Sequence, residues 1–361
     1  MKVTQFTRFS ALSLLFLFIA VFVSACDVAP QAPDETQFQV AATFFPYYAI
    51  ASEVVGDVGV VFSVVPPTVE PHSFSPSPSD IRRLAGADAF IISGVEFEAF
   101  ENQLANTLSN TTLLIYANTN LELLYGHDHD HHDDHDHHDD HDSDYHRDEY
   151  ADEHYDDHDS DYHHDEYADE HYDDHDSDYH HDEYADEHED EVIDPHVWLS
   201  PQNAIIIAQT IASELSERFP EHEAQFNANA AAFIQSLTQV HEQYEQGLAQ
   251  CAQDHILVSH NAFAYLAHDY DFEVISVSGL SPESEPTPRQ LAELIEKARE
   301  YNIGVVYFDE FVQPRVAQTI AREVGAQVYA LHTLEGSSDG LSFIEMLEQN
   351  LDKLKIGLEC Q

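Results

Sequence analysis

Residues 39–65 read QVAATFFPYYAIASEVVGDVGVVFSVV, and this stretch determines the fold class. The apolar run at 39–44 predicts a strand, the residues at 46–55 predict a helix that Pro46 opens, and 60–65 predicts a second strand. A strand, a helix and a strand in this order are typical of a parallel sheet, whose strands need a crossover connection. The stretch therefore predicts an α/β lobe.

The same alternation continues along the chain and begins again in its second half. In the first half we expect further strands at 89–93 and 112–116, and helices at 79–86, 97–108 and 201–219, the first of them capped by Ser79 or Asp80. In the second half we expect strands at 255–259, 272–277, 305–308 and 327–331, and helices at 262–270, 287–301, 314–324 and 341–355.

A long helical pattern at 220–250 separates the two halves. At 1.5 Å per residue this helix would be about 45 Å long, which is enough to span two lobes. We therefore predict an N-terminal α/β lobe at 38–219, a linking helix at 220–250 and a C-terminal α/β lobe at 251–361, with a cleft between the lobes.

The N-terminus has the features of an export signal. Lys2 and Arg8 precede an apolar stretch at 11–23, and the sequence Val23-Ser24-Ala25-Cys26 follows it. Small residues before a Cys resemble the lipobox of bacterial lipoproteins, and the alternative is a plain signal cleaved after Ala25. We expect 1–26 to be a signal peptide ending at lipidated Cys26, and 27–37 to be a flexible tether.

Two further cysteines, Cys251 and Cys360, complete the three in the chain. In an exported protein the setting is oxidising, so we expect the two thiols to form a disulfide. Two buried free thiols are the alternative.

The segment 127–191 holds 18 of the 26 histidines and is otherwise almost entirely Asp, Glu and Tyr. Its repeats begin at Asp142, Asp159 and Asp176, a constant spacing (159 − 142 = 17 and 176 − 159 = 17). Imidazoles mixed with carboxylates predict contact with metal ions such as zinc, and an inert acidic spacer is the alternative. Without an apolar pattern the segment cannot form a core, so we expect disorder there.

The formal net charge of −56 indicates which kinds of partner the chain can bind. Such a chain repels nucleic acid and anionic lipid headgroups and attracts cations. We therefore expect no nucleic-acid partner.

Eight histidines lie outside this segment, and three of them follow predicted strands of the α/β lobes. They are His72 in EPHSFSPSPSD, His196 in DPHVWLSP and His260 in SHNAFAYLA. Loops at the carboxyl ends of parallel strands are the usual place for a binding site. For the remaining five we expect surface or structural roles: His222, His241, His255, His268 and His332.

These segments, together with GLSPESEPTPRQLAELI at 279–295, resemble the zinc-binding subgroup of the zinc and manganese substrate-binding lipoproteins of ABC transporters. The resemblance covers nearly all of the mature chain. It implies two parallel-sheet α/β lobes joined by one long rigid helix, with the metal in the interlobe cleft. The acidic His-rich insert in the first lobe is also similar to that of zinc members.

By the same resemblance the metal ligands are His72, His196 and His260. In manganese members a carboxylate stands where this chain has His260, so a nitrogen-rich zinc site is favoured. Glu335 in LHTLEGSS resembles the fourth ligand, with Glu70 or water as alternatives. Glu335 could otherwise be an exposed loop carboxylate.

We therefore expect a zinc receptor rather than an enzyme, exported to the periplasm or cell surface and tethered by Cys26. Its partners would be an ABC permease and the ATPase subunit, and we expect a monomer. The alternatives are a manganese or iron receptor, a zinc hydrolase, and a His-rich metal buffer or adhesin. The chain has no HExxH motif and shows no general base beside the histidines, which disfavours the hydrolase.

Overall fold

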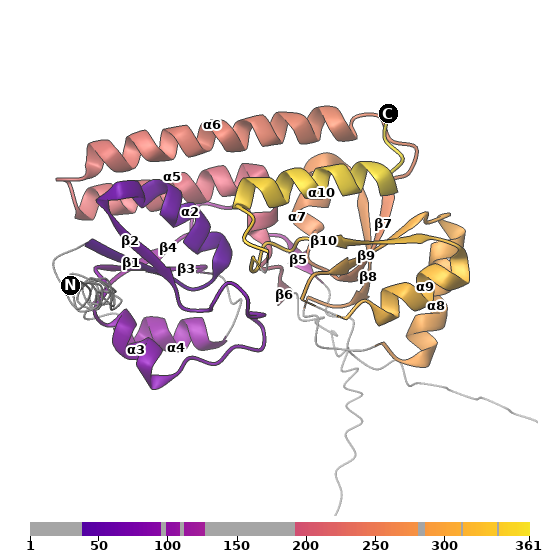
Figure 1. Ribbon diagram of the computed structural model, residues 1–361, viewed down its shortest axis with the longest axis horizontal. Helices are drawn as coiled ribbons and strands as arrows, with labels where there is room; N and C mark the ends of the chain where they lie inside the picture. Colours follow the sequence, from indigo (N-terminus) through magenta and orange to yellow (C-terminus); the bar gives the residue numbers. More distant parts are fainter. Residues whose placement is uncertain are drawn as a thin grey trace, which may run out of the picture.

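The computed structural model describes residues 38–94, 99–108, 112–126, 192–280, 286–311, 313–337 and 339–361. The prediction of two parallel-sheet α/β lobes is confirmed (Figure 1). The signal peptide predicted at 1–26, the tether at 27–37 and the insert at 127–191 lie outside the described residues. Among the helices of the described ranges, none combines the length and the apolar character that a membrane span requires.

The N-terminal lobe is built on a four-stranded sheet of order β2-β1-β3-β4, with every neighbouring pair parallel. Its strands are β1 (Phe38–Ala42), β2 (Gly59–Ser63), β3 (Ala89–Ile92) and β4 (Leu113–Tyr116). Figure 1 shows α2 (Phe45–Val55) and α5 (Pro201–Arg218) on one face of the sheet, and α3 (Pro78–Leu84) and α4 (Ala99–Leu108) on the other. Because both faces are covered, β3 is buried along its whole length.

The C-terminal lobe repeats this topology. Its sheet has the order β10-β9-β7-β8, so the first strand again lies between the second and the third. Its strands are β7 (His255–His260), β8 (Glu273–Ser278), β9 (Val305–Asp309) and β10 (Gln327–Leu331), and its helices are α7 (Ala264–Tyr270), α8 (Pro288–Glu300), α9 (Arg315–Val324) and α10 (Phe343–Gly357). Equivalent strand-to-helix loops therefore leave the carboxyl ends of both sheets.

The long helix α6 (Glu223–Leu248) lies along both lobes (Figure 1). It packs against α2 and α5 of the first lobe and against α7 and α10 of the second. Asn229 donates a hydrogen bond to the carbonyl of Val54 at 3.1 Å, and the Tyr244 hydroxyl donates to the carbonyl of Leu347 at 2.7 Å. The helix is therefore attached to each lobe by packing and by a hydrogen bond.

Several helices begin with Ser or Thr followed by Pro. The predicted cap of α3 at Ser79 or Asp80 is wrong, because Ser77 is the cap and Pro78 occupies the first turn. The Ser77 hydroxyl accepts from the Asp80 amide at 3.4 Å, and the Asp80 carboxylate accepts from the Ser77 amide at 2.8 Å. Ser200 before α5 and Thr287 before α8 cap in a similar way.

Two short strands, β5 (Tyr125–Gly126) and β6 (Val192–Ile193), pair antiparallel on either side of the His-rich segment. A short 3-10 helix, η2 (Val197–Leu199), follows β6, and η1 (Gly56–Val58) follows α2. At the other end of the chain the Sγ atoms of Cys251 and Cys360 are 2.01 Å apart. The backbone amide of Gln253 donates to the carbonyl of Leu358 at 3.0 Å, so the segments that follow α6 and α10 are paired there.

Candidate metal centre

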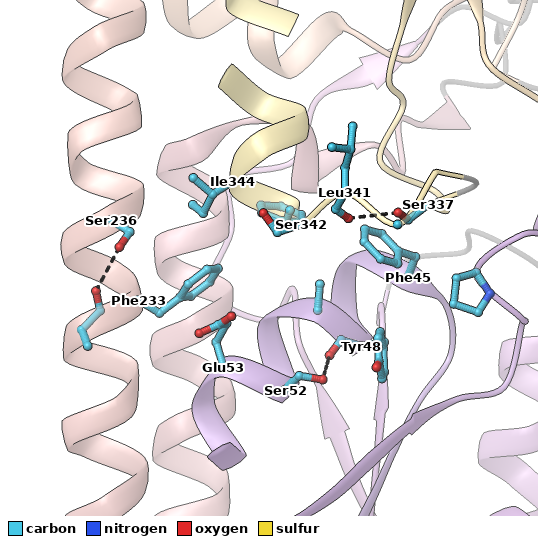
Figure 2. A pocket seen from close by; sticks show the side chains of 15 residues that line it. Phe45, Tyr48, Ser52, Glu53, Phe233, Ser236, Ser337, Leu341, Ser342 and Ile344 are labelled. Carbon is cyan, nitrogen blue, oxygen red and sulfur yellow. Dashed lines mark hydrogen bonds between the residues drawn. The ribbon is translucent and has the colours of Figure 1, made fainter. Parts of the chain in front are cut away.

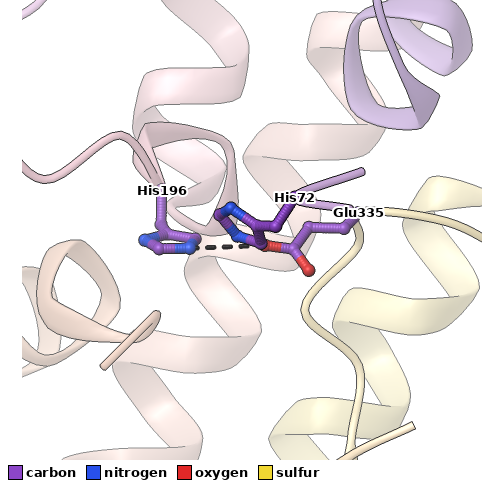
Figure 3. Close-up of side chains that lie close together, drawn as sticks. All are labelled: His72, His196 and Glu335. Atoms are coloured by element: carbon purple, nitrogen blue, oxygen red, sulfur yellow. Dashed lines mark ion pairs between the residues drawn. The ribbon is translucent and has the colours of Figure 1, made fainter. Parts of the chain in front are cut away.

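The four residues predicted as metal ligands lie together between the lobes. The Nε2 atoms of His72 and His196 are each 3.3 Å from Oε1 of Glu335 (Figure 3). The ring centroid of His260 is 5.5 Å from that of His196 and 6.5 Å from that of His72. The first lobe thus contributes two imidazoles and the second lobe contributes one imidazole and the carboxylate.

His72 lies in the loop between β2 and α3. The carboxylate of Glu70 accepts hydrogen bonds from the backbone amides of His72 and Ser73, both at 2.9 Å. Glu70 therefore holds the loop that carries His72, and it belongs to neither group of clustered donors in the described part of the chain. This arrangement disfavours Glu70 as the fourth ligand.

His196 is fully buried between β6 and η2. Asp194 accepts a hydrogen bond from the backbone amide of His196 at 2.9 Å, and its Oδ1 is also 2.8 Å from Nδ1 of the ring. A carboxylate at Nδ1 favours the tautomer that carries its proton there, which leaves Nε2 as the ligand atom facing Glu335. Asp194 is part of the DPH motif, but nothing in the motif indicated a role for it.

Glu335 lies in the loop after β10 and is 1% exposed, so its interpretation as an exposed surface carboxylate is wrong. The residue before it, Leu334, has a φ of 56°, a backbone conformation that non-glycine residues rarely adopt. The backbone amide of Ser337 donates to the carbonyl of Pro67 at 2.7 Å. The loop that carries Glu335 is therefore bound directly to the loop of the other lobe that leads to His72.

Gly336 permits this close approach of the two loops. A Cβ atom at this position would lie 2.4 Å from the carbonyl oxygen of Pro67 and 2.5 Å from Cζ of Phe311. The Trp198 indole also donates to the carbonyl of Thr333 at 2.8 Å, so the same loop contacts the segment after His196. Glu335 is held by both parts of the first lobe that carry imidazoles.

A cavity of about 540 Å³ lies behind this joint, between α2, α6 and the start of α10 (Figure 2). Pro67 and Ser337 form part of its wall, together with Phe45, Tyr48 and Phe233. None of the residues that line it is a His or a Cys. The only carboxylate in this lining is that of Glu53, so the cavity offers no cluster of metal donors.

His260 is the last residue of β7 rather than part of the loop after it, and Asp309 is the last residue of the neighbouring strand β9. Nδ1 of His260 is 3.4 Å from Oδ2 of Asp309, and both side chains are 1% exposed. The sequence motifs did not indicate this carboxylate, which lies beside His260, where no candidate general base was expected. An Asp that ends a buried strand at the binding edge of a sheet is the signal that could have identified it.

Burial and mutual contacts shift the pKa values of the clustered histidines and carboxylates away from those of exposed side chains. Burial raises the pKa of Glu335, but the contacts with His196 and His72 outweigh it and keep the pKa well below its ordinary range. Burial raises the pKa of Asp309 well above its ordinary value, and the nearby charge of Glu335 adds to the effect. Burial lowers the pKa of His260 to about 3.

Burial also disfavours the charged form of His196, but Asp194 and Glu335 outweigh burial, so the net change is a raised pKa. Near neutral pH the cleft thus contains a neutral His260 and an ionised Glu335. Neutral imidazoles with a carboxylate suit zinc and other borderline divalent ions.

Two α/β lobes of the same topology meet at buried imidazoles and carboxylates, which is the architecture of a two-lobed binding protein with a cluster of potential metal donors. The family model described as ZnuA, zinc-uptake complex component A periplasmic, matches residues 40–357, and the chain belongs to this family. The family description is that of a binding component of an uptake complex, not of an enzyme.

Curated relatives and solved structures agree with this assignment. The zinc-binding protein AdcA of Streptococcus pyogenes serotype M3 is 28% identical over 350 residues, which is 95% of this chain and 60% of that protein. The chain therefore spans less than two thirds of AdcA. The high-affinity zinc uptake system protein ZnuA of Bacillus subtilis is 28% identical over 98% of this chain and 99% of its own length. The Zn(II)-bound ZnuA-like domain of Streptococcus pneumoniae AdcA is 27% identical, with a TM-score of 0.66 over 90% of this chain and 99% of that domain.

Proposed function

We propose that this protein is the zinc receptor of an ABC importer, which captures Zn²⁺ between its lobes and delivers it to a membrane permease driven by an ATPase subunit. The observation that carries the proposal is that His72 and His196 of the first lobe each lie 3.3 Å from one oxygen of Glu335, which belongs to the second lobe. An ion at this point would join the lobes, as a receptor that must hold and release its cargo requires.

In this proposal His72, His196, His260 and Glu335 are the zinc ligands. Three nitrogens and an oxygen, all from side chains that are at most 7% exposed, form an enclosed donor set. Enclosed four-ligand sites are typical of tight binding, whereas hydrolytic zinc sites leave one position to water. The buried carboxylate of Asp309 lies beside His260, but the enclosed ligands and the family favour a receptor over a hydrolase.

The remaining segments would serve the same task. We propose that Cys26 carries the lipid anchor, that 27–37 is the tether, and that the His-rich insert 127–191 binds further zinc weakly and raises its local supply. The insert begins directly after β5 and ends directly before β6, three residues ahead of Asp194 (194 − 191 = 3). We also propose a Cys251–Cys360 disulfide, which mass spectrometry of the non-reduced chain would test through the count of free thiols.

The test is a competition titration with a zinc chelator, on the mature chain with and without residues 127–191, using Zn²⁺ and then Mn²⁺. We expect one tight zinc site in both forms, weaker sites only when the insert is present, and tighter binding of zinc than of manganese. If removal of residues 127–191 abolishes all tight zinc binding, the protein is a metal buffer instead.

A matched pair of histidine variants locates the tight site. His260→Ala removes a buried imidazole of the cleft, whereas His268→Ala removes an imidazole on α7 that is 69% exposed. The tight site should disappear in the first variant and remain in the second. Equal zinc affinity of the two variants would contradict the proposed position of the site.

A further inference from the structure

The carboxylate of Asp309 is fixed in place and directed toward the metal centre. Its backbone amide donates to the hydroxyl of Ser259 at 2.9 Å, which ties the end of β9 to the end of β7. Its Oδ1 accepts from the backbone amide of Phe311 at 2.8 Å. The orientation of the carboxylate is thereby set, and Oδ2 faces His260.

Oδ2 of Asp309 and both ring nitrogens of His260 are buried and make no hydrogen bond. Nδ1 of His260 and Oδ2 of Asp309 have only their 3.4 Å contact with each other. Leaving a buried polar atom without a hydrogen bond costs about 1–3 kcal/mol, so this cluster indicates that a partner binds there. A ring nitrogen of His260, an oxygen of Asp309 and an oxygen of Glu335 lie within 4.8 Å of one another, which makes a second donor group that shares Glu335 with the first.

The spacing of these donors also fits ligands of one ion. For metal bonds of about 2.1 Å at tetrahedral angles, neighbouring ligand atoms are about 3.4 Å apart. The contacts from Glu335 to His72 and to His196 are both 3.3 Å, and the contact from His260 to Asp309 is 3.4 Å. The Asp309 contact therefore has the same length as the contacts between the proposed ligands.

We propose that Asp309 is a further metal ligand, so that the cleft binds its cation through three imidazoles and two carboxylates. This inference rests on the proposed metal-binding function of the cleft and names one more donor of that site. A fifth donor permits a coordination number above four. An additional carboxylate also favours harder divalent ions such as Mn²⁺, which prefer oxygen ligands.

The direct test is a crystal structure of the zinc-loaded chain. We expect an oxygen of Asp309 at about 2.0–2.2 Å from the zinc, the usual length of a bond from zinc to a carboxylate. An Asp309 oxygen that hydrogen-bonds to His260 Nδ1 and stays outside bonding distance of the zinc would overturn the proposal.

The second test compares Asp309→Asn with Asp352→Asn, which removes an exposed carboxylate from α10. Asn retains an oxygen for the Phe311 amide but loses the negative charge. In Asp309→Asn we expect the affinity for Mn²⁺ to fall about 10–100-fold and the affinity for Zn²⁺ to fall less. Asp352→Asn should bind both ions like the unaltered chain.

The outcomes separate this inference from the proposed function. If His260→Ala loses tight binding while Asp309→Asn binds both ions unchanged, only the role of Asp309 is wrong. If His260→Ala also binds zinc unchanged, the cleft is not the site and the proposed function fails with it. Melting temperatures of the metal-free variants verify that each is folded.

Discussion

The two lobes share one strand order, yet they hold their proposed metal donors by different means. In the first lobe His72 and His196 lie in loops, and each backbone amide is bound by a carboxylate two residues earlier, Glu70 or Asp194. In the second lobe His260 and Asp309 are the last residues of adjacent strands, so the sheet itself sets their positions. If a loop of the first lobe shifts, the local hydrogen bonds should keep the shape of the segment around His72 or His196. His260 and Asp309 cannot shift in this way without disturbing the pairing of β7 and β9.

Removing an imidazole tests both lobes at once and should have the largest effect. His196→Ala and His260→Ala should each weaken zinc binding by more than the ~10–100-fold that is typical when a hydrogen-bond partner of a ligand is removed. Chelator competition measures this loss. Wild-type affinity in either variant would contradict the assignment of that residue as a ligand.

Removing the support of a loop donor should have the next largest effect. Asp194→Ala deletes the acceptor at Nδ1 of His196 and should reduce zinc affinity about 10–100-fold, while Asp194→Asn retains an acceptor and should reduce it less. Calorimetric titration of both variants provides the comparison. Equal losses in the two variants would mean that the charge of Asp194, and not its hydrogen bond, supports the site.

Adding a methyl group at the joint between the lobes tests their close approach. Gly336→Ala places a Cβ atom 2.4 Å from the carbonyl oxygen of Pro67, so the loop carrying Glu335 must move away. Overpacking of this kind costs about 1–3 kcal/mol, which corresponds to roughly tenfold or more in zinc affinity if the strain falls on the closed site. Gly304→Ala is the matched comparison, because neither glycine has a positive φ and the nearest atom to the Cβ added at Gly304, Oε1 of Glu359, is 3.9 Å away.

The increase in melting temperature caused by zinc should depend on pH, because the histidines of the two lobes differ in pKa. The pKa of His196 is raised from 6.5, so its stabilising effect on the metal-free chain is present below pH 6.5 and is lost as the pH rises through the raised pKa. The raised pKa of Asp309 acts with the same sign, whereas His260 stays neutral down to about pH 3. Zinc must displace these protons, so the increase in melting temperature caused by zinc should be larger at pH 8 than at pH 6. Thermal scans with and without zinc measure this, and a zinc effect independent of pH would contradict it.

The sequence predicted most of the fold because its strands are short apolar runs with clear boundaries. The strand at 327–331 matches β10, and other strands differ by one or two residues at their ends. The cap of α3 was misplaced because three serines precede Asp80, and only the structure shows that Ser77 bonds to it. His72, His196 and His260 were identifiable because each lies in a motif that is a short continuous segment of the chain.

Asp309 is not part of such a motif, and only its place at the end of a strand could have indicated it. It lies 49 residues after His260 (309 − 260 = 49), and their contact depends on which strands are neighbours in the sheet. Asp is also a common residue at the end of a strand, so its type alone did not indicate a ligand. The burial of Glu335 likewise depends on the approach of the other lobe at Pro67.

The positions of the proposed ligands along the chain also determine when a zinc site can exist during synthesis. The first is His72 and the last is Glu335, 263 residues later (335 − 72 = 263), and Glu335 follows the final strand of the second sheet. A chain that emerges N-terminus first, or is threaded unfolded through a membrane, cannot assemble this centre until nearly all of it has been released. A chain threaded unfolded through a membrane would therefore take no zinc in the proposed tight site from the compartment in which it is made.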